Sequence, residues 1–273
     1  MVVVPVSSYA DYRNIIKGKK LINNGFLPTE INKYITQKRL SYCQFGNRLF
    51  LLYNEMNYYQ LVCESIESHD MPGSFSFELP KPVVCHIVVK KNNSSTAEII
   101  KFLQASGYRL RCTIHEFVRE SLDDLPDIPG KAVQICNKIT GISECQEILS
   151  LWQNNLPLYE VPYMLPEDIQ LLSDKNQLIY LKDCFSGRII GARFYDVFLG
   201  TTTGHHNVVG PYYRGKGYGG VLLNAWLLQA RQLGARIARV WIEDKNVVSQ
   251  NNVSKVGFVK TSNLSYQYIK NVN

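Results

Sequence analysis

Apolar and polar residues follow one another along this chain in two rhythms, one typical of strands and one typical of helices. At 236–242, Ala238, Val240 and Ile242 alternate with more polar positions, which predicts a strand with one buried face. The run Gly219–Leu233 is long and strongly apolar, and Gly234 follows it where helices commonly end, so it predicts a buried helix.

The same criteria give a regular order of elements in the second half of the chain. They predict strands at 131–136, 177–182, 188–199, 201–209 and 236–242, helices at 143–152, 166–172, 219–233 and 247–256, and one or two last strands within 258–269. Ser143 is the expected N-cap of the first of these helices. Strands alternating with helices in this way predict a mixed α/β fold.

The first half of the chain repeats the later part of this order. Strands at 48–53 and 58–63 form a predicted hairpin, and a strand at 83–90, a helix at 94–105 and a strand at 109–118 follow. The succession of strand, helix, Gly-aromatic pair and strand recurs in the last part of the chain, which indicates a weak internal repeat. The acidic stretch Glu120–Gly130 contains two prolines and is typical of a linker. We therefore expect two domains, 1–130 and 131–273.

The composition is that of an ordinary globular protein. Of the 273 residues, 45% are hydrophobic and 19% are charged, which argues against extensive disorder. The net charge of +7 suits an anionic small molecule as well as a nucleic acid, so it selects neither. No apolar stretch reaches the roughly 18 residues of a membrane helix, and Met1–Pro5 predicts a strand instead of a signal peptide. No membrane partner is expected.

Seven cysteines are scattered along the chain, an odd number without a C-x-x-C pair. Several lie in apolar runs, where a free thiol behaves as a small hydrophobic side chain. This pattern indicates neither a disulfide framework nor a metal site, and it favours a reducing, cytoplasmic environment.

The segment Asn207–Leu223 leads from a predicted strand into a predicted helix through closely spaced glycines. Glycine permits left-handed backbone conformations and lets a ligand approach without a Cβ in the way. The free N–H groups in the first turn of a helix attract an anion, and Arg214 and Lys216 add positive charge suited to phosphate oxygens. The segment therefore predicts a cradle for two linked phosphates.

Other glycine-rich motifs fit this segment less well. A Walker A loop requires Lys-Ser/Thr after its last glycine, and none follows Gly217. The spacing of Gly215, Gly217 and Gly220 matches a dinucleotide fingerprint, yet Glu243 and Asp244 come later than that fold requires, and the preceding strands are expected to be antiparallel. A turn that merely begins a helix is the plainer alternative, but it leaves the two cations unexplained.

The run Val209-x-Pro-x-Tyr-Arg-Gly-Lys-Gly-Tyr-Gly219 resembles the coenzyme-A-binding motif of the GNAT superfamily of N-acetyltransferases, Q/R-x-x-G-x-G/A, together with its preceding strand. A second stretch, Asn246-x-x-Ser249 followed by Lys255-x-Gly-Phe258, is similar to the family's N-x-x-A/S and K-x-G-F. The resemblance covers roughly residues 131–270.

This resemblance implies a mostly antiparallel sheet in which two adjacent strands, here 201–209 and 236–242, splay apart around the pantetheine arm of the coenzyme. It implies acetyl-CoA or another acyl-CoA as co-substrate, and no metal. The residues implied in coenzyme binding are Val208, Val209, Arg214, Gly215, Lys216, Gly217, Tyr218, Gly219, Gly220, Asn246 and Ser249. The first half is expected to be a degenerate GNAT-like domain without a cradle, because Pro72-Gly73, typical of a turn, stands where glycines would be needed.

Acyl transfer from a thioester to an amine needs a base for the ammonium and a donor for the oxyanion. By resemblance, a backbone N–H at about Val209 is the donor. His205 is a candidate base because a histidine side chain ordinarily titrates near neutral pH, and the adjacent His206 is expected on the opposite face of the strand. Glu243, at the end of a predicted strand, is an equal alternative, with Asp244 beside it.

The proton for the leaving thiolate has several candidate sources in the sequence. The family usually has a tyrosine seven residues after the asparagine of the second motif, and Val253 stands there instead. Ser249 or Tyr212 are substitutes, and solvent is another. No cysteine lies in either motif, which favours direct attack by the acceptor in a ternary complex.

The sequence thus predicts a cytoplasmic N-acyltransferase that moves an acetyl or short acyl group to a primary amine of a small molecule or peptide. No nucleic acid is expected, and a homodimer is left open. Two alternatives stay open: a tandem-domain transferase that uses aminoacyl-tRNA, and a non-catalytic sensor of acyl-CoA. The intact cradle counts against the first alternative, and Val253 favours the second.

Overall fold

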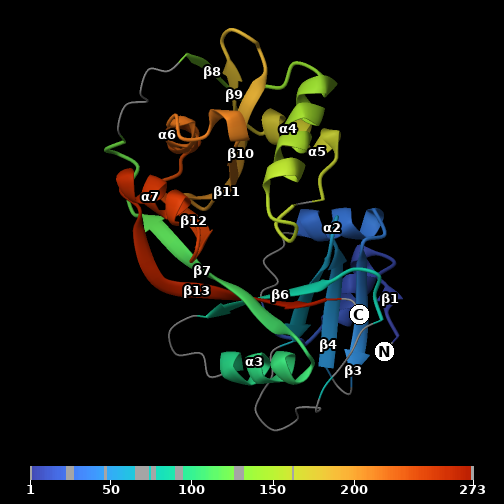
Figure 1. Ribbon diagram of the computed structural model, residues 1–273. Coiled ribbons are helices and arrows are strands. Elements are labelled where there is room, and N and C mark those ends of the chain that lie inside the picture. Colours follow the sequence, from blue (N-terminus) through green and yellow to red (C-terminus); the bar gives the residue numbers. More distant parts are fainter. Residues whose placement is uncertain are drawn as a thin grey trace. The chain divides into compact units, whose positions relative to one another are not determined.

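The computed structural model describes residues 2–22, 28–45, 48–64, 74, 78–89, 95–125, 132–161 and 163–271 (Figure 1). The chain forms two compact units. Unit 1 consists of Met1–Ile114 and Ser262–Asn273, and unit 2 of His115–Thr261. The boundary predicted near residue 130 falls within 126–131, outside the described residues, and stays a prediction.

Unit 2 is built on a sheet in the order β7-β12-β11-β10-β9-β8. Its strands are β7 (Arg109–Arg119, shared with unit 1), β8 (Val133–Cys136), β9 (Leu178–Asp183), β10 (Ile189–Phe198), β11 (Thr201–Val209) and β12 (Ile237–Glu243). β8 to β11 pair antiparallel, whereas β11 and β12 are parallel. The mixed, mostly antiparallel sheet predicted from the sequence is confirmed.

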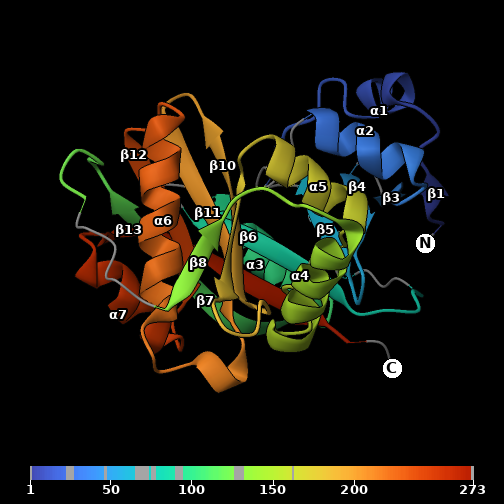
Figure 2. The ribbon, with the colours of Figure 1, turned by 90° about the horizontal axis from the view of Figure 1, so that it is seen from above.

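Helices cover both faces of this sheet (Figure 2). They are α4 (Ile142–Asn155), α5 (Pro166–Asp174), α6 (Tyr218–Gln232) and α7 (Val247–Lys255). In β10, Ile190 and Tyr195 pack with Trp226 of α6, whereas Ala192 and Phe194 pack with Trp152 of α4. Alternation from Ala192 to Tyr195 gives α4 with α5 one face and α6 the other. The register shift between Ile189 and Gly191 places Ile190 on the α6 side as well.

Helix α4 begins one residue before its predicted N-cap. Gly141 precedes the helix and Ile142 opens it, so the prediction of Ser143 as N-cap is wrong. The physical reason lies in Glu144, whose carboxylate accepts the Thr140 N–H at 2.7 Å and forms an ion pair with Lys182. The Glu144 side chain, which lies within the helix, thus accepts the Thr140 amide that precedes the helix.

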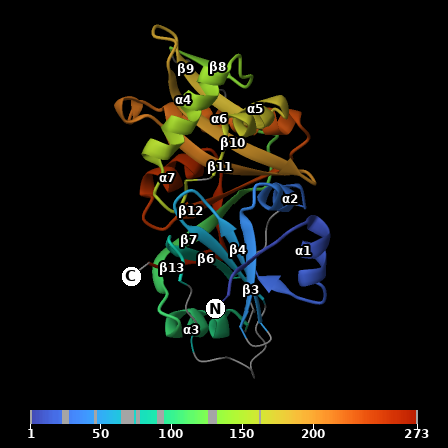
Figure 3. The ribbon, with the colours of Figure 1, turned by 90° about the vertical axis from the view of Figure 1, so that its right-hand side faces the viewer.

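Unit 1 has a similar sheet in the order β1-β3-β4-β5-β6-β13 (Figure 3). Its strands are β1 (Val4–Pro5), β2 (Leu21–Ile22), β3 (Leu40–Phe45), β4 (Arg48–Asn54), β5 (Tyr59–Glu64), β6 (Val83–Val89) and β13 (Val259–Lys270), and its helices α1 (Tyr9–Ile15), α2 (Pro28–Thr36) and α3 (Ser95–Ala105). In β4, Phe50 packs with Phe102 of α3, whereas Leu49 and Leu51 belong to a cluster with Tyr12 of α1. Helices therefore cover both faces of this sheet too.

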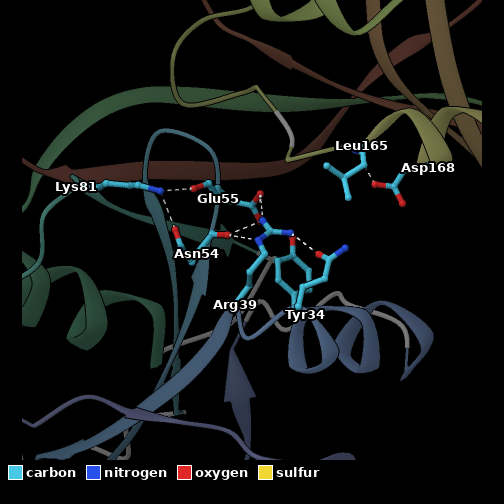
Figure 4. A network of polar contacts seen from close by, with 8 residues as sticks. Tyr34, Arg39, Asn54, Glu55, Lys81, Leu165 and Asp168 are labelled. Atoms are coloured by element: carbon cyan, nitrogen blue, oxygen red, sulfur yellow. Dashed lines mark hydrogen bonds and ion pairs between the residues drawn. The ribbon is translucent and has the colours of Figure 1, made fainter. Parts of the chain in front are cut away.

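A buried ion pair fixes the hairpin ends in unit 1. The Arg39 guanidinium lies 3.1 Å from the Glu55 carboxylate, and it also donates to the Asn54 carbonyl oxygen (Figure 4). Tyr34 of α2 donates to the same carboxylate, and Lys81 donates to the Asn54 side chain and the Glu55 carbonyl, each at 2.9 Å. Burial raises the pKa of Tyr34 well above its ordinary value. These contacts satisfy charges that would otherwise be costly to bury.

Each unit contains one strand that comes from the other half of the sequence. β13, which follows α7, pairs antiparallel with β6 of unit 1 from Leu264↔Val89 to Lys270↔Val83. β7, which follows α3, is the neighbour of β12 in unit 2. The two halves of the sequence have thus exchanged their last strands, which is why the compact units do not correspond to two consecutive stretches of chain.

Candidate functional site

The parallel strands β11 and β12 of unit 2 separate soon after they begin. They pair only at Thr201↔Ile237, Thr202↔Ala238 and Thr203↔Arg239. Beyond these pairs Val240 and Ile242 of β12 stay packed in the cluster that surrounds α6, while β11 continues along β10. The predicted splay between 201–209 and 236–242 is present, because the two strands are no longer paired beyond Thr203↔Arg239. We call the unpaired space between them the gap.

A bulge interrupts β11 in this gap. Ala192 of β10 pairs with Val208 and Phe194 pairs with His205, so Arg193 alone lies opposite both His206 and Asn207. His206 has a φ of +40°, a left-handed conformation that is uncommon outside glycine. A bulge breaks the regular alternation of side chains and re-aims them.

The two histidines consequently share a face of the strand, contrary to the expectation that they point apart. The ring centroids of His205 and His206 lie 4.9 Å and 5.1 Å from that of Phe194, and His205 is nearly parallel to it. Trp152 of α4 closes the group at 5.3 Å from Phe194. The bulge is the physical reason, because one additional residue returns the next side chain to the same side.

The environments of the two rings differ sharply. Burial, together with the nearby His205 and Arg193, lowers the pKa of His206 to about 3, so this ring is neutral at physiological pH. His205 is 37% exposed, and its Nε2 lies 2.8 Å from the Asp196 carboxylate. A carboxylate in this position orients the imidazole. His205 is thus the ring that solvent or a ligand can reach.

The glycine-rich segment after β11 forms a loop with unused backbone donors. A single helical turn at Pro211–Tyr213 is followed by Gly215 and Gly217, whose φ angles of +75° and +84° require glycine, and α6 begins at Tyr218. Within the described part of the chain, the N–H groups of 215–219 have no hydrogen-bond acceptor, whereas those of Tyr213, Gly220 and Val221 do. Five successive amides at the positive end of a 15-residue helix are therefore available to an anion.

Some of the side chains predicted to bind the coenzyme are engaged in contacts within the protein. Arg214 folds back, with Nε 3.0 Å from the Val209 carbonyl oxygen and a terminal nitrogen 2.8 Å from the Asn155 side chain. Lys216 lies with Nζ 5.6 Å from the centroid of the Tyr213 ring. The Val208 side chain is buried toward α4. The Val209 side chain packs against the cluster around α6, so neither valine offers its side chain to a ligand.

Glycines keep the backbone at the start of α6 accessible. A Cβ at Gly220 would meet nothing within 4 Å, and one at Gly219 would meet only amide nitrogens at ordinary van der Waals distance. The carbonyl of Gly219 accepts a long hydrogen bond, 3.4 Å, from the Asn207 side chain. This surface is open enough for a ligand to contact the main chain directly.

The second predicted motif begins α7. The side-chain oxygen of Asn246 accepts the Ser249 N–H at 3.1 Å, so this pair caps the helix. Gln250 donates to the carbonyls of Glu243 and Asp244 at 3.0 Å and 2.9 Å, which fixes the end of β12. The Glu243 carboxylate side chain is half-buried at this strand end, and Ser249 is half-buried on α7.

Val253 lies in the core and not at the surface of the gap. It is 5% exposed and belongs to the cluster around α6. No proton donor is available at this position.

One residue near the gap was missed in the sequence. Arg193 of β10 is 3% exposed, and its guanidinium carbon lies 3.9 Å from the centroid of the Trp226 ring. A lone arginine in an apolar strand gives no signal that distinguishes a buried charge from a surface one.

The described residues offer neither a metal site nor a membrane span. No group of three or more His, Cys, Asp or Glu side chains there is placed to hold a metal ion. None of the helices in the described ranges has the length and apolar character needed to span a bilayer.

Comparison with known proteins gives one family and many similar folds. Residues 145–258 match the sequence model of the acetyltransferase (GNAT) family. The structure is similar to that of a GCN5-related N-acetyltransferase from Sphaerobacter thermophilus, with a TM-score of 0.59 and 11% identity over 100% of this chain and 96% of that one. No curated protein sequence matches.

Two further structures are similar over most of the chain. One is a tandem GNAT protein from the clavulanic acid biosynthesis pathway, with a TM-score of 0.59 and 10% identity over 100% of this chain and 98% of that one. The other is a GCN5-related N-acetyltransferase from Kribbella flavida, with a TM-score of 0.56 and 14% identity over 88% of this chain and 94% of that one. At these identities the likeness shows the fold alone, and the tandem structure is consistent with a second GNAT-like region in the N-terminal half.

Proposed function

From the match of residues 145–258 to the sequence model of the acetyltransferase (GNAT) family, we propose that the protein is an N-acyltransferase that moves an acetyl or short acyl group from acyl-coenzyme A to a primary amine. The acceptor is a small molecule or a peptide. The observation that carries the proposal is the run of five unpaired N–H groups at 215–219, placed at the open end of the gap between β11 and β12.

These amides are proposed to bind the pyrophosphate of the coenzyme. Amides at a helix N-terminus stabilise phosphate oxygens through hydrogen bonds and through the helix dipole. Lys216 adds a mobile positive charge, and Arg214 can do so by leaving Asn155, since both ends of that hydrogen bond are exposed. The pantetheine arm then lies in the gap, where the backbone of β11 beyond Gly204 has no neighbouring strand on the β12 side.

The proposed transfer is direct. The neutral amine attacks the thioester carbon, so that the C–N bond forms and the carbonyl electron pair moves to oxygen. This oxyanion is stabilised by the backbone N–H of Val209, at the end of β11. When it collapses, the C=O bond re-forms and the C–S bond breaks with its electron pair leaving on sulfur. The amine loses one proton, and the thiolate takes up one proton from Ser249 or solvent.

His205 is the base that we favour for the amine proton. It is part-exposed, its Nε2 lies 2.8 Å from Asp196, and it sits on β11 beside the gap. The neutral His206 next to it is too strongly buried to take up a proton near neutral pH. Glu243, at the end of β12, is the alternative base. Asn246 and Ser249 fix the first turn of α7, which follows β12 in the chain.

The proposal is tested in two steps that separate binding from chemistry. Isothermal titration of the purified protein with acetyl-CoA should show binding, and release of free thiol in the presence of a library of primary amines should show transfer. Binding without thiol release for any amine would instead favour a non-catalytic acyl-CoA sensor, the alternative that buried Val253 supports. No binding at all would reject the proposal.

Replacing His205 by glutamine tests the base. His205→Gln should lower kcat by about 100-fold or more, the usual loss on removing a general base, with little change in the affinity for acetyl-CoA. Glu243→Gln is the matched variant for the alternative. If only the latter variant loses activity, Glu243 is the base and His205 is structural.

A further inference from the structure

Two asparagine side chains meet at the first turn of α6, beside the loop of free amides. Asn207 lies in the bulge of β11, and its side-chain nitrogen donates to the Gly219 carbonyl oxygen at 3.4 Å. Asn252 lies on α7. A Cβ added to Gly219 would be 3.5 Å from the side-chain nitrogen of Asn252 and 3.9 Å from that of Asn207. The two carboxamides therefore converge on one side of Gly219 from two different elements.

A buried valine next to each asparagine directs its side chain to this place. Val208 is buried toward α4, so the preceding Asn207 faces the opposite side of β11, where α6 begins. On α7, Val253 packs into the cluster around α6. Asn252, one residue earlier, is half-buried at the edge of that contact. The positions of both carboxamides thus follow from the packing of the core.

Both carboxamides have hydrogen-bonding groups to spare. Each offers two donors and one acceptor. Asn207 uses one donor in a bond at the long end of the usual range. The Asn252 side chain has no hydrogen-bond partner within the described ranges. The pair therefore has donors and acceptors left for a ligand at Gly219.

The chemical character of the site changes at Gly219. Residues 215–219 offer free N–H groups, and Lys216 adds a positive charge, which together suit phosphate oxygens. The side chains that meet at Gly219 are neutral carboxamides. A carboxamide both donates and accepts, so it matches a hydroxyl or an amide better than an anion. Coenzyme A has its groups in this same order, because its pyrophosphate is followed by a pantetheine arm with one hydroxyl and two amides.

We infer that Asn207 and Asn252 bind the hydroxyl and the first amide of the pantetheine arm, and that they make the site select ligands with this arm over nucleoside diphosphates. The inference rests on the proposed function, because it requires the pyrophosphate to lie at 215–219. The hydroxyl and the first amide follow the phosphate ester within one short segment of the arm. They consequently fall beside Gly219 when the phosphates are held by its N–H and by those before it.

The test compares two ligands that share the adenosine and the pyrophosphate. 3′-Dephospho-coenzyme A has a pantetheine arm after the pyrophosphate, and ADP has none. Calorimetry on the full chain should find dephospho-coenzyme A bound about fivefold or more weakly by Asn252→Ala than by the wild type, the effect of one lost hydrogen bond. The affinity for ADP should be unchanged. ADP is titrated in competition with dephospho-coenzyme A, so that a weak affinity is still measured.

Three further variants sharpen the result. Asn207→Ala should show the same selective loss, and the double variant a larger one. Asn251→Ala, at the exposed neighbouring asparagine of α7, should bind both ligands as the wild type does. Alanine favours a helix at either position, so Asn251→Ala and Asn252→Ala should melt at similar temperatures. Asn252→Asp adds a negative charge close to the phosphates and should weaken both ligands.

The outcomes separate this inference from the proposed function. An equal loss for both ligands in Asn252→Ala overturns the inference, because the residue then acts on the phosphates or on the fold of the site. Unchanged affinities in Asn252→Ala, or in Asn252→Asp, overturn it as well, since the residue then lies away from the ligand. In each of these cases coenzyme binding at 215–219 stands. No binding of either ligand to the wild type overturns both.

Discussion

Both units contain a pair of parallel strands that join at only three positions, yet the two pairs differ beyond those positions. In unit 2, β11 and β12 pair at Thr201–Thr203 and then leave a gap. In unit 1, β5 and β6 pair at Tyr59–Leu61, after which β2 pairs with β5 at Cys63 and Glu64. Because β4 occupies the other edge of β5 as far as Cys63, β2 pairs along the edge that β6 leaves.

This difference shows what turns a splayed strand pair into a binding site. The edge of a strand that loses its neighbour exposes backbone donors and acceptors, which must find partners in protein, solvent or ligand. Unit 1 satisfies part of its free edge with a strand of its own. Unit 2 leaves β11 free, and continues it into a loop of unpaired amides at 215–219. The segment of unit 1 that would correspond to this loop, 65–77 apart from Ser74, lies outside the described residues, so the absence of a cradle there stays a prediction.

The largest expected effect comes from the loop of unit 2. Gly217 has a φ of +84° immediately before α6, a conformation that a β-branched residue rarely adopts. Gly217→Val should therefore move several of the free amides and weaken coenzyme A binding by about 100-fold or more, since each charge-assisted hydrogen bond contributes about 1.5 kcal/mol or more. Calorimetry measures this loss.

Gly187→Val is the matched control. Gly187 also has a positive φ, +69°, with nothing near its missing Cβ, and it lies in the turn between β9 and β10. The two variants should lose similar amounts of stability, but only Gly217→Val should lose coenzyme binding. Equal affinity in both variants would show that the loop is not the phosphate site.

The second prediction uses a feature that the two units share. His86 of unit 1 and His206 of unit 2 have pKa values lowered to about 4 and about 3, mainly by burial. Unfolded histidine titrates near 6.5, so the unfolded chain binds more protons below that pH. The stability that the neutral rings confer is fully present above about pH 6.5 and declines as the pH falls toward the folded-state values.

Urea unfolding at pH 7.5 and pH 5.0 measures this dependence. Each histidine contributes at most about 1.4 kcal/mol per pH unit below 6.5. His206→Gln and His86→Gln should each reduce the loss of stability on acidification, the first in unit 2 and the second in unit 1. An unchanged pH dependence in either variant would mean that the ring concerned takes up its proton without cost and is more hydrated than its surroundings indicate.

The site was easier to predict from the sequence than the connectivity of the strands. The bounds of β11 and the glycine loop could be read from local pattern, because strand periodicity and glycine spacing are properties of a few adjacent residues. The exchange of β7 and β13 could not, since the partner of a strand is chosen by contacts far apart in sequence. The bulge at His206 and the burial of Arg193 could not be predicted from the sequence either. The identity of a polar residue does not indicate whether it is buried or shifted in register.

The smallest expected effect concerns the strand that takes the free edge in unit 1. The Glu64 carboxylate, on β5 where β2 pairs, accepts the N–H of buried Leu49 at 3.0 Å and lies 3.2 Å from Lys19, just before β2. Glu64→Ala should cost about 1 to 2 kcal/mol of unfolding free energy, mostly from the unsatisfied amide. Glu98→Ala, which breaks only the exposed pair with Lys101 on α3, should cost less than about 0.5 kcal/mol. β2 satisfies this edge of β5, so the edge has no free backbone groups for a ligand, and neither variant should change the affinity for coenzyme A. A loss of binding in Glu64→Ala would instead show that unit 1 contributes to the coenzyme site.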